Sequence, residues 1–151
     1  MNNLKEGKLD LGKFSVCPNT NFKDIKENFQ EDDVLHLRRL THADLQDVNI
    51  CGTPCFINLS FKGRISKIEI HPYIKTDKKF PDEETQNEKY ALSTKILDQL
   101  LSAENKETGS NHTLYDMIIY KYEWGYVSCY KVIGGKGMYT GGNINIWYYQ
   151  S

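Results

Sequence analysis

The chain has 151 residues and a mass of 17.5 kDa, with 39% hydrophobic and 26% charged residues. This length and composition fit one globular domain, residues 1–151, that can bury a hydrophobic core. The formal net charge of -1 gives no overall field that would attract nucleic acid or an anionic membrane. Because the chain also lacks an apolar run of membrane-spanning length and a secretory signal, we expect a cytoplasmic protein.

The first third of the chain predicts a strand, a helix and a second strand. Residues 12–17 are strand-prone and end at Pro18. Residues 19–21 supply side chains that can cap a helix, and Phe22, Ile25 and Phe29 then recur at helical spacing, so a helix is expected from residue 22 to about 30. Residues 34–40 alternate as a strand does, although a helix remains an alternative there.

Residues 50–72 carry the clearest β-hairpin pattern. Ile57, Leu59 and Phe61 alternate with polar residues, and the pair Lys62-Gly63 follows them as a turn.

A long helix is expected after this hairpin. Asp82 is the predicted N-cap, with Pro81 before it and two glutamates in the first turn. Apolar side chains then form a broad stripe at helical spacing: Leu92, Ile96, Leu97, Leu100 and Leu101. The opposite face, expected to remain in water, carries Lys89, Lys95, Asp98 and Glu104.

The last third predicts a polar loop followed by three strands. Residues 105–113 are expected to form the exposed loop, and the strands are residues 114–122, 126–132 and 143–149. The expected order is therefore β-α-β-β-β-α-β-β-β. It predicts an α+β fold, with a mainly antiparallel sheet of about five to six strands and two helices packed on one of its faces.

The cysteines and histidines do not assemble into a strong catalytic or metal-binding motif. Three residues separate Cys51 from Cys55, which is neither a redox motif nor half of a strong zinc signature. We interpret all four cysteines as reduced structural thiols, with a disulfide or a metal site as less favoured alternatives, and expect no cofactor. Cys129 and His112 permit a nucleophile and base by composition alone.

Two further motifs could in principle serve ligand binding or catalysis, but their sequence context favours structural roles. The glycine-rich stretch 134–142 leads into a strand rather than a helix, which favours a hairpin loop over an anion site. The acidic pairs Asp32-Asp33 and Glu83-Glu84 are adjacent in sequence, so their side chains diverge and favour solvated caps over a general acid and base. We therefore do not expect an enzyme.

Aromatic residues crowd the last third of the chain, where eight of the ten tyrosines and both tryptophans lie. Alternation separates Tyr120 and Tyr122 from Met117 and Ile119, so some rings should reach the surface. They either pack along the rim of the sheet with their hydroxyls in water or form a face that binds another protein. Residues 51–81 carry six basic and two acidic residues, whereas residues 82–107 carry three basic and seven acidic ones. The acidic helix is most simply a solvated face, and the alternative is a surface that meets a basic partner.

The element order, the segment Tyr122-Glu-Trp-Gly-Tyr-Val-Ser-Cys-Tyr130 and the closing Asn143-Ile-Asn-Ile-Trp147 resemble small bacterial α+β immunity proteins of contact-dependent and other polymorphic toxin systems. This resemblance implies non-enzymatic binding that occludes a toxin domain inside the producing cell.

The aromatic and acidic features together predict a partner-binding set. Its members are Tyr122, Trp124, Tyr130, Tyr139, Trp147, Asp82, Glu83 and Glu84. One alternative is a small-molecule-binding or enzymatic domain with its pocket between the sheet and the long helix. Another is a homo-oligomer that buries the aromatic surface.

Overall fold

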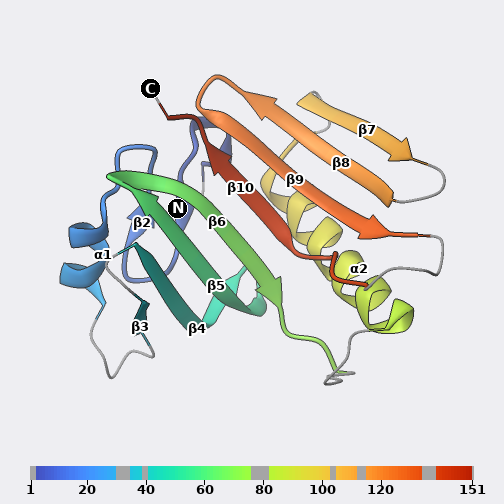
Figure 1. Ribbon diagram of the computed structural model, residues 1–151, viewed down its shortest axis with the longest axis horizontal. Helices are drawn as coiled ribbons and strands as arrows, with labels where there is room; N and C mark the ends of the chain where they lie inside the picture. Colours follow the sequence, from blue (N-terminus) through green and yellow to red (C-terminus); the bar gives the residue numbers. More distant parts are fainter. Residues whose placement is uncertain are drawn as a thin grey trace.

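The computed structural model describes residues 3–29, 35–38, 41–75, 82–102, 105–111, 115–133 and 139–150. Within these residues, eight strands form one antiparallel sheet in the order β3-β4-β5-β6-β10-β9-β8-β7. The strands are β3 (Leu35–Arg38), β4 (His42–Ile50), β5 (Thr53–Lys62), β6 (Arg64–Pro72), β7 (Lys106–Asn111), β8 (Tyr115–Tyr122), β9 (Gly125–Val132) and β10 (Ile144–Tyr148). Figure 1 shows the last strand, β10, between β6 and β9, where it joins the two groups of strands.

One face of the sheet is covered by both helices and by the N-terminal segment. Helix α1 (Phe22–Asn28) lies near β5, where the rings of Phe22 and Phe61 meet edge to face at 5.6 Å. Helix α2 (Glu83–Leu100) packs against β9 and β6. The N-terminal segment contains a 3-10 turn, η1 (Leu4–Glu6), and the short strands β1 (Leu9–Asp10) and β2 (Ser15–Val16), which pair with each other.

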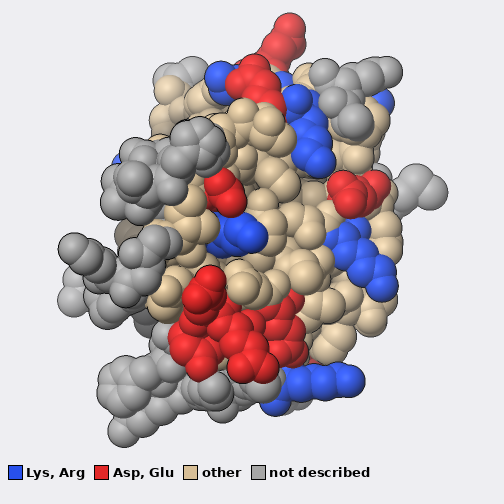
Figure 2. Space-filling model, turned by 90° about the vertical axis from the view of Figure 1, so that its right-hand side faces the viewer, with Lys and Arg blue, Asp and Glu red and all other residues tan. Residues whose placement is uncertain are grey.

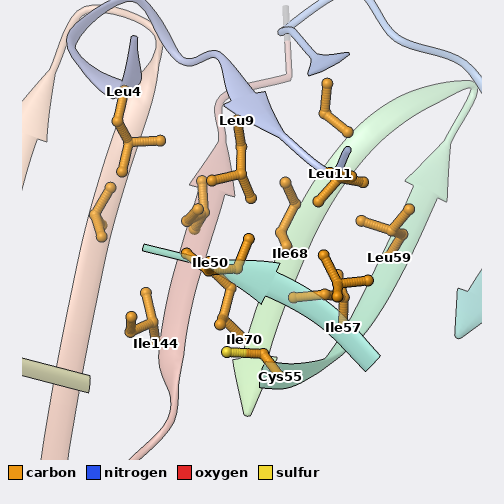
Figure 3. Close-up of a cluster of buried hydrophobic side chains, with 14 of the residues drawn as sticks. Leu4, Leu9, Leu11, Ile50, Cys55, Ile57, Leu59, Ile68, Ile70 and Ile144 are labelled. Atoms are coloured by element: carbon orange, nitrogen blue, oxygen red, sulfur yellow. The ribbon is translucent and has the colours of Figure 1, made fainter. Parts of the chain in front are cut away.

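The hydrophobic core lies between this covering layer and the sheet. Figure 3 shows Leu4, Leu9 and Leu11 of the N-terminal segment above the isoleucines of the strands. Ile57, Ile70 and Ile144 are directly opposite one another on β5, β6 and β10, and all three are fully buried. Alternation along each strand therefore places every second side chain in the core and the others on the opposite face.

The two predicted helices form because their first turns are capped as expected. Asn21 accepts a hydrogen bond from the backbone N–H of Asp24, and the Asp24 carboxylate accepts one from the backbone N–H of Asn21. Asp82 caps α2 by accepting hydrogen bonds from the backbone N–H and the hydroxyl of Thr85. Both caps satisfy backbone donors that have no partner within the helix.

The α+β class, the antiparallel sheet and the two helices on one face are confirmed, but the expected strand count was too low. β4 was not predicted because a bulge between Leu45 and Val48 interrupts its alternation, and Asp47 there has a φ of 56°. The predicted polar loop at residues 105–113 is wrong over residues 106–111, which form β7. This edge strand pairs with β8 through its backbone and needs no apolar face.

The expectation that Lys89 stays in water is also wrong. Its side chain is half-buried, and its ammonium lies 2.7 Å from His71 Nδ1. Lys95 and Asp98 are exposed as expected. Several sequence-based interpretations fall outside the described residues, namely those for Asp32-Asp33, Glu104, His112 and the 134–138 part of the glycine-rich stretch.

Candidate functional site

The face of the sheet opposite the helices is called the open face, because no helix among the described residues packs against it. A row of polar side chains crosses its centre, each directly opposite the next on neighbouring strands. The row consists of Asp44, Asn58, Glu69, Asn145 and Ser128. Asn58 Nδ2 donates to Asp44 Oδ1, and Asn143 Nδ2 donates to Asn145 Oδ1. These contacts hold the amide and carboxylate groups of the row in place.

An aromatic surface, defined by Tyr126, Trp147 and Tyr149, lies beside this polar row. The Tyr126 and Trp147 rings stack with centroids 6.1 Å apart, and Tyr149 lies 6.2 Å from Tyr126. Lys67 places its ammonium 4.3 Å from the centroid of the Trp147 ring. The three aromatic residues line a groove of about 410 Å³ together with other side chains of β8 and β9.

The open face carries most of the large hydrophobic side chains that are exposed within the described residues. These are Tyr115, Trp147 and Tyr149, which are 38%, 37% and 51% exposed. The fourth such residue, Tyr73, follows the end of β6. Exposed aromatic rings on a sheet face offer a large contact area at a small cost in side-chain entropy. The aromatic surface is therefore suited to contact with another macromolecule.

Two residues of the predicted partner-binding set lie on the covered face instead. Tyr122 and Trp124 stack on each other with centroids 5.6 Å apart and an interplanar angle of 5°. Trp124 Nε1 donates to the backbone carbonyl of Lys5, and its ring lies 5.1 Å from that of Tyr148. The two rings help to hold the N-terminal segment on the sheet and do not share a surface with Trp147.

The remaining members of the predicted set are divided between the open face, the end of the sheet and the start of α2. Tyr130 lies on the open face opposite Met117, and Tyr139 lies at the end of the sheet. Asp82, Glu83 and Glu84 lie at the start of α2, where Asp82 is the N-cap and the two glutamates are exposed. Figure 2 shows acidic side chains gathered at the lower part of the face on which α2 begins.

Sequence reasoning did not assign Tyr126 and Tyr149 to the candidate site. Their placement depends on the pairing of Trp147 with Tyr126 across β10 and β9. Alternation within one strand shows which side chains share a face, but it does not show which strand lies alongside. No signal within the sequence of either strand could have brought these rings together.

A pocket of about 450 Å³ lies at the end of the sheet, between β6 and the start of α2. Its walls include the aromatic rings of Phe56, Tyr73 and Tyr139, and its polar groups come from His71 and Lys89. This is the region in which the sequence placed the alternative small-molecule pocket.

Lys89, His71 and Glu69 form a chain of polar contacts that reaches into this pocket. Lys89 Nζ lies 2.7 Å from His71 Nδ1, and His71 Nε2 lies 3.6 Å from Glu69 Oε1. Burial lowers the pKa of the Lys89 ammonium, against the opposing effect of the Glu69 carboxylate and Cys129. The neighbouring His71 imidazole lowers the pKa of Glu69, although burial acts in the opposite direction.

The four cysteines, all within the described residues, are free thiols. Burial raises the pKa of Cys55 and of Cys129 to about 12, so both thiols are protonated at neutral pH. Among the residues that the structure describes, no group of three or more histidine, cysteine, aspartate or glutamate side chains could hold a metal ion.

Comparison with known proteins adds no relative. No family model matches the chain, and no curated protein and no solved structure matches it either. Neither of the two α-helices in the described part of the chain has the combination of length and apolar character that a membrane span requires.

Proposed function

We propose that this chain is a non-enzymatic cytoplasmic binding protein that holds another protein on the open face of its sheet. The observation that carries the proposal is the aromatic surface, where Trp147 and Tyr149 are exposed beside a groove of about 410 Å³. Large rings around a groove are typical of the residues that dominate binding energy at protein interfaces.

The charges around the aromatic surface favour a protein over a nucleic acid. Lys67 lies 3.9 Å from the Glu69 carboxylate, and Lys121 lies 3.1 Å from that of Glu107. These carboxylates offset much of the positive charge that phosphate groups would need.

The resemblance in the closing segments supports a bacterial toxin domain as the partner. Binding on the open face would then occlude the toxin, as the resemblance implies for immunity proteins. A partner that extends past the end of the sheet would also meet Glu83 and Glu84 at the start of α2. Basic side chains on that part of the partner would complement this acidic end.

The test is capture of a partner from lysate of the source cells, followed by measurement of its affinity for purified variants. Trp147→Ala removes an exposed ring of the aromatic surface, and Lys95→Ala changes an exposed residue on the helical side as a matched control. We expect the wild type and Lys95→Ala to bind equally, and Trp147→Ala to weaken binding by about 30-fold, as for an interface hot spot.

Immunity requires a second result. The captured partner should arrest growth when expressed alone, and the wild-type chain should restore growth better than Trp147→Ala. Equal binding of Trp147→Ala and the wild type would refute the proposed surface. Recovery of the tagged chain alone would contradict the proposal that it binds another protein. A concentration-dependent dimer in light scattering would indicate self-association instead.

A further inference from the structure

The pocket at the end of the sheet exists because β6 extends to Pro72, beyond the point at which its neighbour β10 begins. The pairing of the two strands starts at Ile144 and Ile70, and the glycines that precede β10 turn toward α2. Gly142 donates to the carbonyl of Tyr130, and Gly141 donates to the side chain of Gln86. His71, the next residue of β6, therefore lies beside a gap that the first turns of α2 close from behind.

Lys89 crosses this gap from the helix to the strand. Its Cβ lies near Gly142, and its nitrogen reaches His71 Nδ1 at 2.7 Å. Glu69 on the far side of the imidazole completes a carboxylate, imidazole and amine in sequence. In enzymes with an activated nucleophile, a base oriented by a third group contacts the nucleophile in the same way.

We propose that Lys89 is a nucleophilic amine in this pocket and that it captures small aldehydes or ketones with an apolar body as imines. The arrangement supplies the two requirements of such a site, which are an amine next to a base and a cavity that holds the carbonyl compound beside it. Burial disfavours the charged ammonium and increases the fraction of free amine at neutral pH.

The chemistry of the pocket selects the ligand class. Phe56, Tyr73 and Tyr139 provide aromatic walls for an apolar body. The Glu69 carboxylate contacts the pocket residue His71, and Glu88, the neighbour of Lys89 in the sequence, accepts a hydrogen bond from the backbone N–H of Lys75. These negative charges disfavour an anionic ligand, so a neutral carbonyl compound fits better.

The reaction balances without a cofactor. His71 takes one proton from the Lys89 ammonium, and the Glu69 carboxylate stabilises the imidazolium that results. The amine lone pair forms a bond to the carbonyl carbon, the carbonyl π electrons move to oxygen, and a proton passes from nitrogen to that oxygen. His71 then returns its proton to the hydroxyl group, which leaves as water while the C=N bond forms. One ammonium and one carbonyl group thus give one protonated imine and one water.

The experiment traps this imine with a known probe. The full chain is incubated at pH 7 with benzaldehyde and sodium cyanoborohydride, which reduces the imine to a stable benzylamine, and the labelled lysines are mapped by mass spectrometry. Lys95, exposed on the same helix, serves as the internal reference. We expect labelling of Lys89 to be faster than that of Lys95 by about tenfold or more, because the pocket raises the local concentration of the carbonyl compound.

Two variants separate the roles of the residues. Lys89→Arg keeps the positive charge and should lose the fast label while Lys95 reacts as before. His71→Gln should slow labelling of Lys89 at pH 7 but approach the wild-type rate at pH 10, where a free amine no longer needs the base. Lys89 is faced by Glu69 and His71 on β6 and by Cys129 on β9. Neither variant replaces Glu69 or Cys129.

Two results would overturn the proposal. One is labelling of Lys89 no faster than Lys95 in the wild type, which requires no variant to fold. The other is an unchanged rate in His71→Gln at pH 7, provided that its circular dichroism spectrum matches the wild type. A larger ratio of Lys89 to Lys95 labelling with the anionic aldehyde glyoxylate than with benzaldehyde would refute the neutral ligand class. The pocket shares Glu69 with the polar row of the open face, but the labelling experiment uses the chain without a protein partner, so either proposal can fail alone.

Discussion

Replacement of Trp124 by alanine should destabilise the protein far more than the same replacement of Trp147. Trp124 stacks on Tyr122 at 5.6 Å, lies 5.1 Å from Tyr148 and donates a 2.9 Å hydrogen bond to the carbonyl of Lys5. Two aromatic pairs, one hydrogen bond and the lost packing together suggest a decrease of about 3–4 kcal/mol in the free energy of unfolding.

Trp147 makes weaker contacts from an exposed position. Its ring stacks on Tyr126 at 6.1 Å and receives the Lys67 ammonium at 4.3 Å, while 37% of the residue remains exposed. These two contacts suggest a loss of only about 1 kcal/mol. For a domain of this size, the expected fall in Tm is about 10 °C for Trp124→Ala and about 3 °C for Trp147→Ala.

Urea and thermal unfolding at pH 7, followed by far-ultraviolet circular dichroism, measure both losses under identical conditions. Each variant retains the other tryptophan, whose fluorescence reports the same transition independently. Losses that agree within about 0.5 kcal/mol would refute the assignment of the two tryptophans to opposite faces with different burial. A larger loss for Trp147→Ala would refute it as well.

Three further predictions concern buried polar and titratable groups. Gln86→Ala removes two hydrogen bonds to the backbone of Val132 and one to the backbone of Gly141. Urea unfolding should show a decrease of about 2–4 kcal/mol in the free energy of unfolding, and a decrease below about 1 kcal/mol would contradict this prediction. Burial raises the pKa of Cys129 to about 12, so iodoacetamide at pH 8 should alkylate Cys17 well before Cys129 in the folded protein and both equally in urea. Burial also raises the pKa of Tyr148 above its ordinary value of 10.0 and that of Cys129 above 9.0, so the unfolded chain loses these protons at a lower pH than the folded protein. These groups should leave Tm unaffected below about pH 9 and lower it as the pH rises toward 12. A constant Tm over this range would argue against their burial.

Local signals in the sequence were sufficient for most of the elements. Asn21 and Asp82 each cap a helix by bonding to a backbone N–H three residues later, a contact that depends only on local spacing. The alternation of Ile57, Leu59 and Phe61 placed one face of β5 in the core. β4 and β7 were missed because a bulge breaks the period of one, and the other is a polar edge strand.

The candidate sites depended on tertiary structure to a much greater extent. The sequence alone identified Trp147 as a surface aromatic residue, but only the insertion of β10 between β6 and β9 places it beside Lys67 and Tyr126. Likewise, Lys89 and His71 are 18 residues apart on a helix and a strand, and they meet where α2 packs across the end of β6. Periodicity specifies which face a side chain occupies because it is a property of the backbone of one element. Which elements then become neighbours is decided by the shared hydrophobic core, and that pairing assembles both sites.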